Sequence, residues 1–203
     1  MELSTLEVRW FYEGKCPPAL SEWFHSGSRV SEPERRTDEY LRLPGRDDIG
    51  VKRRAGVQLD LKLRTGRLED PVLPDGFHGP VEAWTKWSFP LGSDAPLPGT
   101  GSWVAIDKRR WSRLYAATGT NAVGPVSFGA DIDAGCAAEL VELAVGSDRA
   151  WGFGFEAFGD CDRAELLAAA CRVLADETPL RAWSFAAGVP HSYPAWLAER
   201  HVA

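Results

Sequence analysis

The stretch IGVKRRAGVQLDLKLRTG, residues 49–66, contains two short runs separated by Ala55-Gly56. In the second run apolar residues alternate with polar ones from Val57 to Arg64, and in the first run Lys52 and Arg54 share one face. Alternation with a period of two is typical of an extended strand with one apolar face. A short glycine-containing step between two such runs favours a turn, so the stretch predicts a β-hairpin with a strongly charged face.

The same alternation recurs along most of the chain. It is found at residues 6–11, 81–89, 103–111, 136–145 and 149–158, with a shorter candidate at residues 38–43. A turn at residues 146–148 separates the last two strands. About eight strands in succession predict a mostly β (α+β) fold, an antiparallel eight-stranded sheet closed into a tunnel-like barrel.

Few helices are expected, and we place them outside the barrel. A short helix should begin near Pro18, because proline suits the first helical turn. A second should follow Asp162, which with Glu165 makes a plausible N-cap, and a last short helix is expected within residues 192–202. Loops are expected at residues 26–36, 67–80 and 93–101. The chain length suits a single domain over residues 1–203, with residues 160–203 as a helical C-terminal extension.

Composition limits the classes of partner. The formal net charge is −6, which argues against a general nucleic-acid binder. The four cysteines form no CxxC pair, so we expect neither a zinc site nor a disulfide framework, and we expect a reducing, cytoplasmic setting. No basic start followed by an apolar run indicates a signal peptide, and no run is long enough to span a membrane.

The direction of the charged faces decides the function. Charged strand faces usually point to water. Here, however, basic residues gather on one face of the middle strands, where they repel one another unless an anion lies among them. Carboxylates occur at a similar phase at Glu7, Glu82, Glu142 and Glu156. Many cations with a few carboxylates suit a polyphosphate and a divalent ion, Mg²⁺ or Mn²⁺.

The order of these elements resembles the CYTH, or triphosphate tunnel metalloenzyme, superfamily over roughly Leu6 to Gly159. The family's first strand carries Glu-x-Glu-x-Lys, which corresponds to Thr5, Glu7 and Arg9. The later basic strands correspond to Lys52 and Arg54, then Lys62, then Lys108 and Arg110. The remaining similarities are the segments Asp38–Leu41 and Glu82–Trp84, an acid at Glu139 or Glu142, and Gly152–Phe158 with Glu156.

The chain also departs from the family pattern. Thr5, Trp84 and Phe158 stand where the family has acidic residues, and Arg9 replaces a lysine. These changes remove up to three carboxylates from the metal cluster that the resemblance implies. Fewer carboxylates should weaken Mg²⁺ binding.

The resemblance implies divalent-metal-dependent hydrolysis of a triphosphate or another organophosphate inside a polar tunnel. It implies catalytic roles for Glu7, Arg9 and Lys62, and metal ligation by Glu7, Glu156 and Glu142. Phosphate binding would involve Lys52, Arg54, Lys62, Arg64, Lys108 and Arg110. The partner would be a small phosphorylated molecule, with no nucleic acid and no membrane. Two alternatives stay open: a non-catalytic protein that binds phosphate or another polyanion, and a β-barrel for an apolar ligand or a protein partner.

Overall fold

The computed structural model describes residues 2–26, 29–69, 71, 73–92, 103–119, 122–176 and 188–200. The linker expected at residues 93–101 lies outside these residues. The elements follow one another as β1 (Glu2–Glu13), α1 (Pro18–His25), β2 (Glu34–Leu41), β3 (Ile49–Arg54), β4 (Gln58–Leu68), β5 (Val81–Pro90), β6 (Trp103–Gly119), β7 (Ala122–Val126), β8 (Gly135–Val145), β9 (Asp148–Phe158), α2 (Arg163–Ala175), β10 (Val189–Pro190) and α3 (Tyr193–Glu199).

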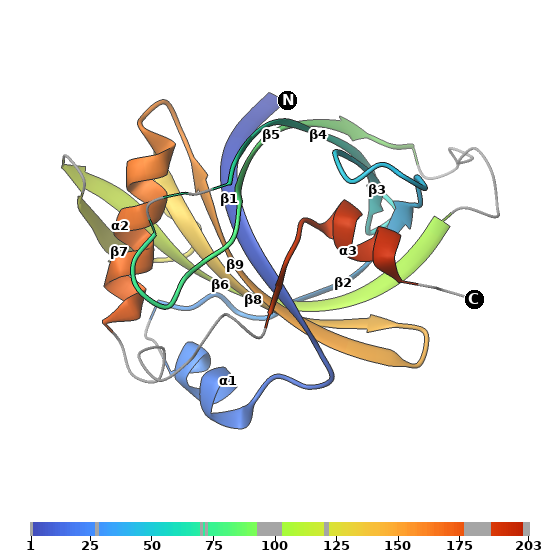
Figure 1. The fold of residues 1–203 in the computed structure, drawn as a ribbon, viewed down its shortest axis with the longest axis horizontal. Coiled ribbons are helices and arrows are strands. Elements are labelled where there is room, and N and C mark those ends of the chain that lie inside the picture. The colour runs from blue at the N-terminus through green and yellow to red at the C-terminus, as the bar shows by residue number, and fades with distance from the viewer. Residues whose placement is uncertain are drawn as a thin grey trace.

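The strands form one antiparallel sheet that closes on itself (Figure 1). Eight of them make the ring in the order β1-β5-β4-β3-β2-β6-β8-β9, and β9 returns to pair with β1. The short strands β7 and β10 are added to β6 and β1. The expectation of a mostly β, antiparallel fold with eight strands around a centre is confirmed, whereas β7 and β10 were not predicted.

The predicted hairpin joins β3 to β4. Its two turn residues, Ala55 and Gly56, have φ angles of +46° and +75°. Two consecutive positive φ angles match the right-handed twist of the flanking strands, which is why a glycine is favoured here. The turn fixes the register so that Lys52 lies opposite Asp60.

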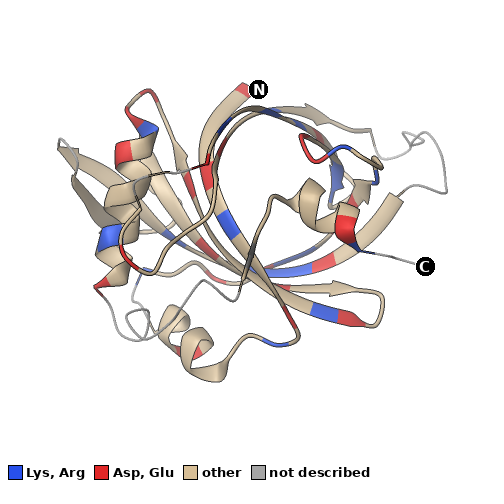
Figure 2. Cartoon of the chain, viewed as in Figure 1, with Lys and Arg blue, Asp and Glu red and all other residues tan. Residues whose placement is uncertain are grey.

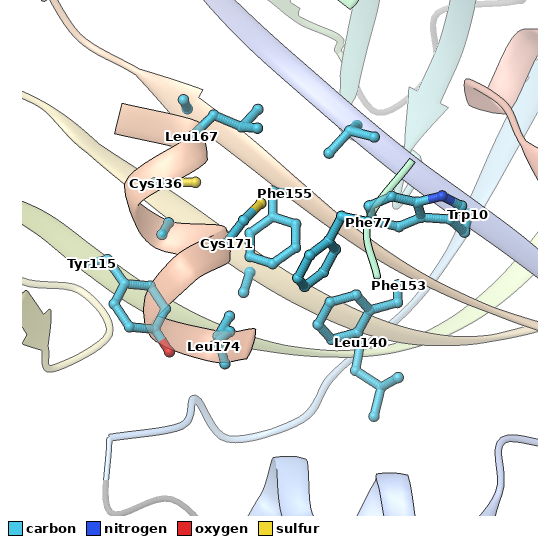
Figure 3. Packing of buried hydrophobic residues seen from close by; sticks show 14 of the residues in the cluster. Trp10, Phe77, Tyr115, Cys136, Leu140, Phe153, Phe155, Leu167, Cys171 and Leu174 are labelled. Atoms are coloured by element: carbon cyan, nitrogen blue, oxygen red, sulfur yellow. The ribbon is translucent and has the colours of Figure 1, made fainter. Parts of the chain in front are cut away.

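The outer face of the ring is covered by α1, α2 and the segment around Phe77. Leu6, Val8 and Trp10 point to this side of β1 and are buried there. Figure 3 shows Cys171 of α2 beside Phe155 of β9 in this outer core. Burying each large apolar side chain contributes about 1.5–3 kcal/mol, so the outer core stabilises β1, β8 and β9 against the helices.

The helix α3 was expected outside the barrel, and the structure places it differently. Phe11 lies on the same face of β1 as Glu7 and Arg9, which line the ring's interior. The indole of Trp196 in α3 stacks on Phe11, with ring centroids 4.8 Å apart. An inner core therefore forms where α3 meets the ring, and it consists of Phe11, Tyr40, Val104, Ile106, Val141, Leu143, Val145, Ala150, Trp196 and Leu197. Figure 1 shows α3 within the opening of the ring.

None of the helices in the described part of the chain has the length and hydropathy that a membrane span requires. All four cysteines lie within that part and are free, with Cys161 exposed and the others buried. A cytoplasmic location stays a prediction.

Candidate functional site

A cavity inside the ring contains about 1040 Å³ of empty space, part of it open to solvent. Strands from every part of the ring contribute to its wall, and residues 190–194 contribute from the C-terminal segment. Figure 2 shows basic and acidic residues on the strands of the ring, and several of them line its interior. The charged faces that the sequence revealed thus include one that points inward.

Most of the predicted site residues lie on this wall. The basic ones are Arg9, Lys52, Arg54, Lys62, Lys108 and Arg110. The acidic ones are Glu7 and Glu156, and Glu82 lies there too. Strand phase explains the agreement, since each pair two residues apart, such as Lys108 and Arg110, must share a face.

Arg64 and Glu142 are placed elsewhere. Arg64 makes bidentate contacts of 3.1 Å with the carboxylate of Asp47 and one of 2.8 Å with Glu82, and it is not on the cavity wall. Glu142 lies on the opposite face of β8 and pairs with Arg109 at 3.6 Å, with both side chains about 40% exposed. Glu139, the other residue considered for the late acidic position, lines the cavity instead. The structure therefore does not bring Glu142 near Glu7 or Glu156.

Arg9, Glu139 and Arg110 form one largely buried group of ion pairs. The two carboxylate oxygens of Glu139 accept hydrogen bonds from Arg9 at 2.7 Å and from Arg110 at 2.6 Å. Burial alone would raise the pKa of Glu139, but Arg110 and Arg9 hold it well below its usual value. The Nη1 atom of Arg9 has no hydrogen-bond partner among the described residues.

The pair of Arg9 and Glu139 is possible because Gly154 lies between them. In the strand register Arg9 is opposite Gly154, and Gly154 is opposite Glu139. A Cβ atom at Gly154 would lie 3.1 Å from both Cβ and Cγ of Arg9. The missing side chain thus lets an arginine reach across one strand to a carboxylate on the next.

Three carboxylates form a row on β5, β1 and β9. Glu7 is directly opposite Glu82 on one side and Glu156 on the other. Glu7 accepts hydrogen bonds from Lys62 and, at 2.5 Å, from Thr5. Burial raises the pKa of Glu7, but Lys62 outweighs it and the pKa is lowered. Burial and the neighbouring Glu7 raise the pKa of Glu156 above its usual value.

A second group surrounds Asp38, which is fully buried on β2. Its Oδ2 atom lies 3.3 Å from Nζ of Lys108 and 3.6 Å from Nζ of Lys52, and its Oδ1 atom accepts a hydrogen bond from Arg36. Burial raises the pKa of Asp38, but Lys52 and Lys108 lower it well below the usual range. Burial and the nearby Arg54 in turn lower the pKa of Lys52 to about 8.

Basic side chains outnumber acidic ones on the wall. Lys86 and Arg36 add to the six predicted basic residues, against five acidic ones, namely Glu7, Asp60, Glu82, Glu139 and Glu156. Lys86 makes no ion pair or hydrogen bond with any residue that the structure describes. Asp38 and Glu34 also pair with wall residues, namely Arg36, Lys52, Lys108 and Arg110. Lys86 is therefore the one basic wall residue without an ion pair in the described part of the chain.

The carboxylates do not form a ready site for Mg²⁺ or Mn²⁺. Within the described ranges, no three His, Cys, Asp or Glu side chains gather in a group that could hold a metal ion. The carboxylate of Glu7 is ion-paired with Lys62, and that of Glu139 is ion-paired with Arg9 and Arg110. Thr5 and Trp84, where the resemblance implies acids, are buried, and the indole of Trp84 donates a hydrogen bond to Glu82. The residues present therefore do not fit the metal centre that the resemblance implies.

Comparison with known proteins finds no family model that matches the chain and no curated protein that matches it.

Several wall residues were not found by the sequence analysis. Arg36 falls in a segment that we interpreted as a loop because it is polar and contains a proline, although its phase with Asp38 and Tyr40 carried a strand signal. Tyr193 comes from α3, and no local pattern indicates that this helix meets the ring's interior. Lys86 shares the phase of Glu82 and Trp84 and was assigned no role.

Proposed function

We propose that the cavity binds the phosphate groups of a small phosphorylated molecule, such as tripolyphosphate or a nucleoside triphosphate. The observation that carries the proposal is the convergence of eight basic side chains from six strands on one cavity, where they outnumber the acidic side chains of the wall. Phosphate oxygens accept charge-assisted hydrogen bonds from Arg and Lys, and such bonds are the stronger ones in proteins.

Two basic groups of the wall support the proposal because each has a nitrogen atom without a hydrogen-bond partner among the described residues. Lys86 makes no hydrogen bond or ion pair in the described part of the chain, although its charge acts on Glu156, and Nη1 of buried Arg9 has no hydrogen-bond partner there. A buried, unpaired N–H of a charged group is costly. An anion in the cavity would pair with Lys86, whereas an apolar ligand would leave it unpaired.

The inner core limits which anions suit the site. Phe11, Val141 and Trp196 fill the interior of the ring where α3 meets it. Apolar side chains do not compensate the loss of water around a phosphate. The ligand that suits this arrangement is a short phosphate chain or a terminal phosphate group rather than a long polymer passing through the ring.

Thermal unfolding with and without anions tests the proposal. With EDTA present to exclude divalent ions, tripolyphosphate should raise the melting temperature of the wild-type protein more than sulfate at equal ionic strength. A ligand at 100 times its Kd adds about 2.7 kcal/mol to the free energy of unfolding. Lys86→Ala should reduce the shift without breaking an ion pair, and Lys15→Ala, an exposed lysine outside the cavity, should leave it unchanged. Equal shifts with both anions would contradict the proposal.

Divalent-metal-dependent hydrolysis, which the resemblance implies, is the second candidate, and it would require Lys62 to release Glu7 in the row of Glu82, Glu7 and Glu156. Burial is the largest cause of the raised pKa of Glu156, and the facing carboxylate of Glu7 adds to it. Phosphate release from tripolyphosphate in Mg²⁺ or Mn²⁺, lost in Glu156→Gln, would make this candidate the better one. Tight binding without release would leave the site as a binding site.

A further inference from the structure

We propose that Lys52 is a nucleophilic amine that forms an imine with the aldehyde or ketone group of an anionic molecule held in the cavity. The reaction goes beyond phosphate binding. Only the preference for an anionic carbonyl compound rests on the proposed function, since the reactivity of Lys52 comes from its own surroundings.

Two lysines crowd around the carboxylate of Asp38. Nζ of Lys52 and Nζ of Lys108 approach the same Oδ2 atom of Asp38, at 3.6 and 3.3 Å. The second carboxylate near Lys52 is Asp60, at 3.7 Å, and Asp60 also receives Arg54. Two shared and rather distant carboxylates compensate the ammonium charge of Lys52 only in part. A lysine that is desolvated beside other cations is the usual nucleophilic lysine.

Access to the cavity distinguishes Lys52 from Lys108. Lys108 is almost completely buried, and its Nζ lies 3.7 Å from the ring centroid of Tyr193 and 4.6 Å from that of Tyr40. It also lies 2.6 Å from the hydroxyl of Tyr40. Burial and the nearby Lys52 lower the pKa of Lys108 as well, so access to the cavity rather than basicity distinguishes the two lysines. Lys52 lines the cavity with 17% of its side chain exposed, and its Nζ is farther from Tyr40, at 5.8 Å. Lys52 is therefore the amine that a ligand reaches.

The charges that face Lys52 come from several elements. Arg54 of β3, Arg36 of β2 and Lys108 of β6 disfavour its protonation, while Asp38 of β2 and Asp60 of β4 favour it. Burial and Arg54 have the larger effect, so the pKa of Lys52 falls to about 8. Near pH 8 about half of the molecules then have an uncharged amine, whereas an exposed lysine keeps its proton.

Formation of the imine requires no oxidant or reductant. The nitrogen lone pair attacks the carbonyl carbon, a C–N bond forms, and a proton moves from nitrogen to oxygen to give a carbinolamine. The C–O bond then breaks, the second nitrogen proton leaves with the oxygen, and water is released. The remaining C=N bond can be trapped by borohydride.

Peptide mapping after trapping tests the proposal on the full chain. The probes are pyridoxal 5′-phosphate and pyridoxal, which has the same aldehyde without the phosphate, each followed by borohydride at pH 8. We expect Lys52 to be modified at least about tenfold faster than the exposed Lys15, with a rate that rises as the pH increases through about 8. Lys52→Arg should lose the fast label and keep the slow labels. A Lys52 label no faster than that of Lys15 would overturn the proposal, and so would fast labelling of Lys108 in its place.

The two probes separate this proposal from phosphate binding. If the cavity binds phosphate, the ratio of Lys52 to Lys15 labelling is larger for pyridoxal 5′-phosphate than for pyridoxal, and tripolyphosphate suppresses it. If phosphate binding fails but Lys52 is reactive, the ratio is high and equal for both probes. If Lys52 is an ordinary ion-paired lysine, the ratio of Lys52 to Lys15 labelling is near one for both probes. That result does not depend on whether tripolyphosphate raises the melting temperature.

Discussion

Gly154 lies between Arg9 and Glu139 in the register of three neighbouring strands, and its lack of a side chain keeps their contact open. The sequence shows this glycine within the run GFGFEAFG, where it is one of several. Alternation alone places it on the inner face but does not indicate which two charged residues meet across it. The importance of the position follows from the register, which only the folded sheet defines.

Replacing Gly154 by alanine should destabilise the fold by about 1–3 kcal/mol, the usual range for an overpacked interior. The new Cβ would lie 2.9 Å from the backbone oxygen of Val8 and push against Arg9. Chemical unfolding measures the change. Gly119→Ala is the control, because nothing lies within 4 Å of a Cβ there and its effect should be near zero. Equal effects at both positions would contradict the explanation.

Asp38 is the counter-ion of Arg36, Lys52 and Lys108, so Asp38→Asn should cost about 3–5 kcal/mol at pH 7. The pKa of Asp38 is lower in the folded protein than its ordinary value of 3.8. Its stabilising effect is therefore complete above about pH 4 and decreases as the pH falls further.

Urea unfolding at pH 7 and pH 3 measures this dependence. The difference between wild type and Asp38→Asn should be large at pH 7 and smaller at pH 3. The exposed Asp131→Asn is the matched control and should show no difference at either pH. A difference that is the same at both pH values would mean that charge at Asp38 does not stabilise the fold.

At the scale of elements, α3 differs most from expectation. Its apolar residues indicated a helix, but nothing in them indicates whether a helix packs outside a sheet or within the ring it forms. The choice is made by partners far apart in the sequence, namely Phe11 on β1 and the apolar ends of β6 and β8. Strands were easier to predict than this helix because their alternation is a local signal, and β2 was predicted too short because its first residues are all polar.

The role of α3 is tested by Trp196→Ala, which removes the ring that stacks on Phe11. We expect a loss of about 3–5 kcal/mol in the free energy of unfolding, as for other buried tryptophans. Leu68→Ala is the control, because Leu68 is about half exposed and contributes little. If Trp196→Ala were no worse than Leu68→Ala, α3 would not be part of the core as described.

In the whole molecule, the closed sheet brings basic residues that are far apart in the sequence to the wall of one cavity. The sequence allowed the mostly β fold, the eight-strand closure and most of the cavity wall to be predicted. It did not allow the ion pairs that occupy Glu7 and Glu139 to be predicted, because each pair joins strands that are distant in the chain. Those pairs are the reason that the carboxylates fit a metal centre poorly, while Lys86, which has no ion pair among the described residues, stays available to an anion.

If these basic groups bind phosphate, calorimetric titration with tripolyphosphate in EDTA should detect binding to the wild-type protein. The affinity should be at least about fivefold lower for Lys86→Ala and unchanged for Lys15→Ala, since one charge-assisted hydrogen bond contributes more than about 1 kcal/mol. No binding to a folded wild-type protein, or the same affinity in all three proteins, would contradict the proposal.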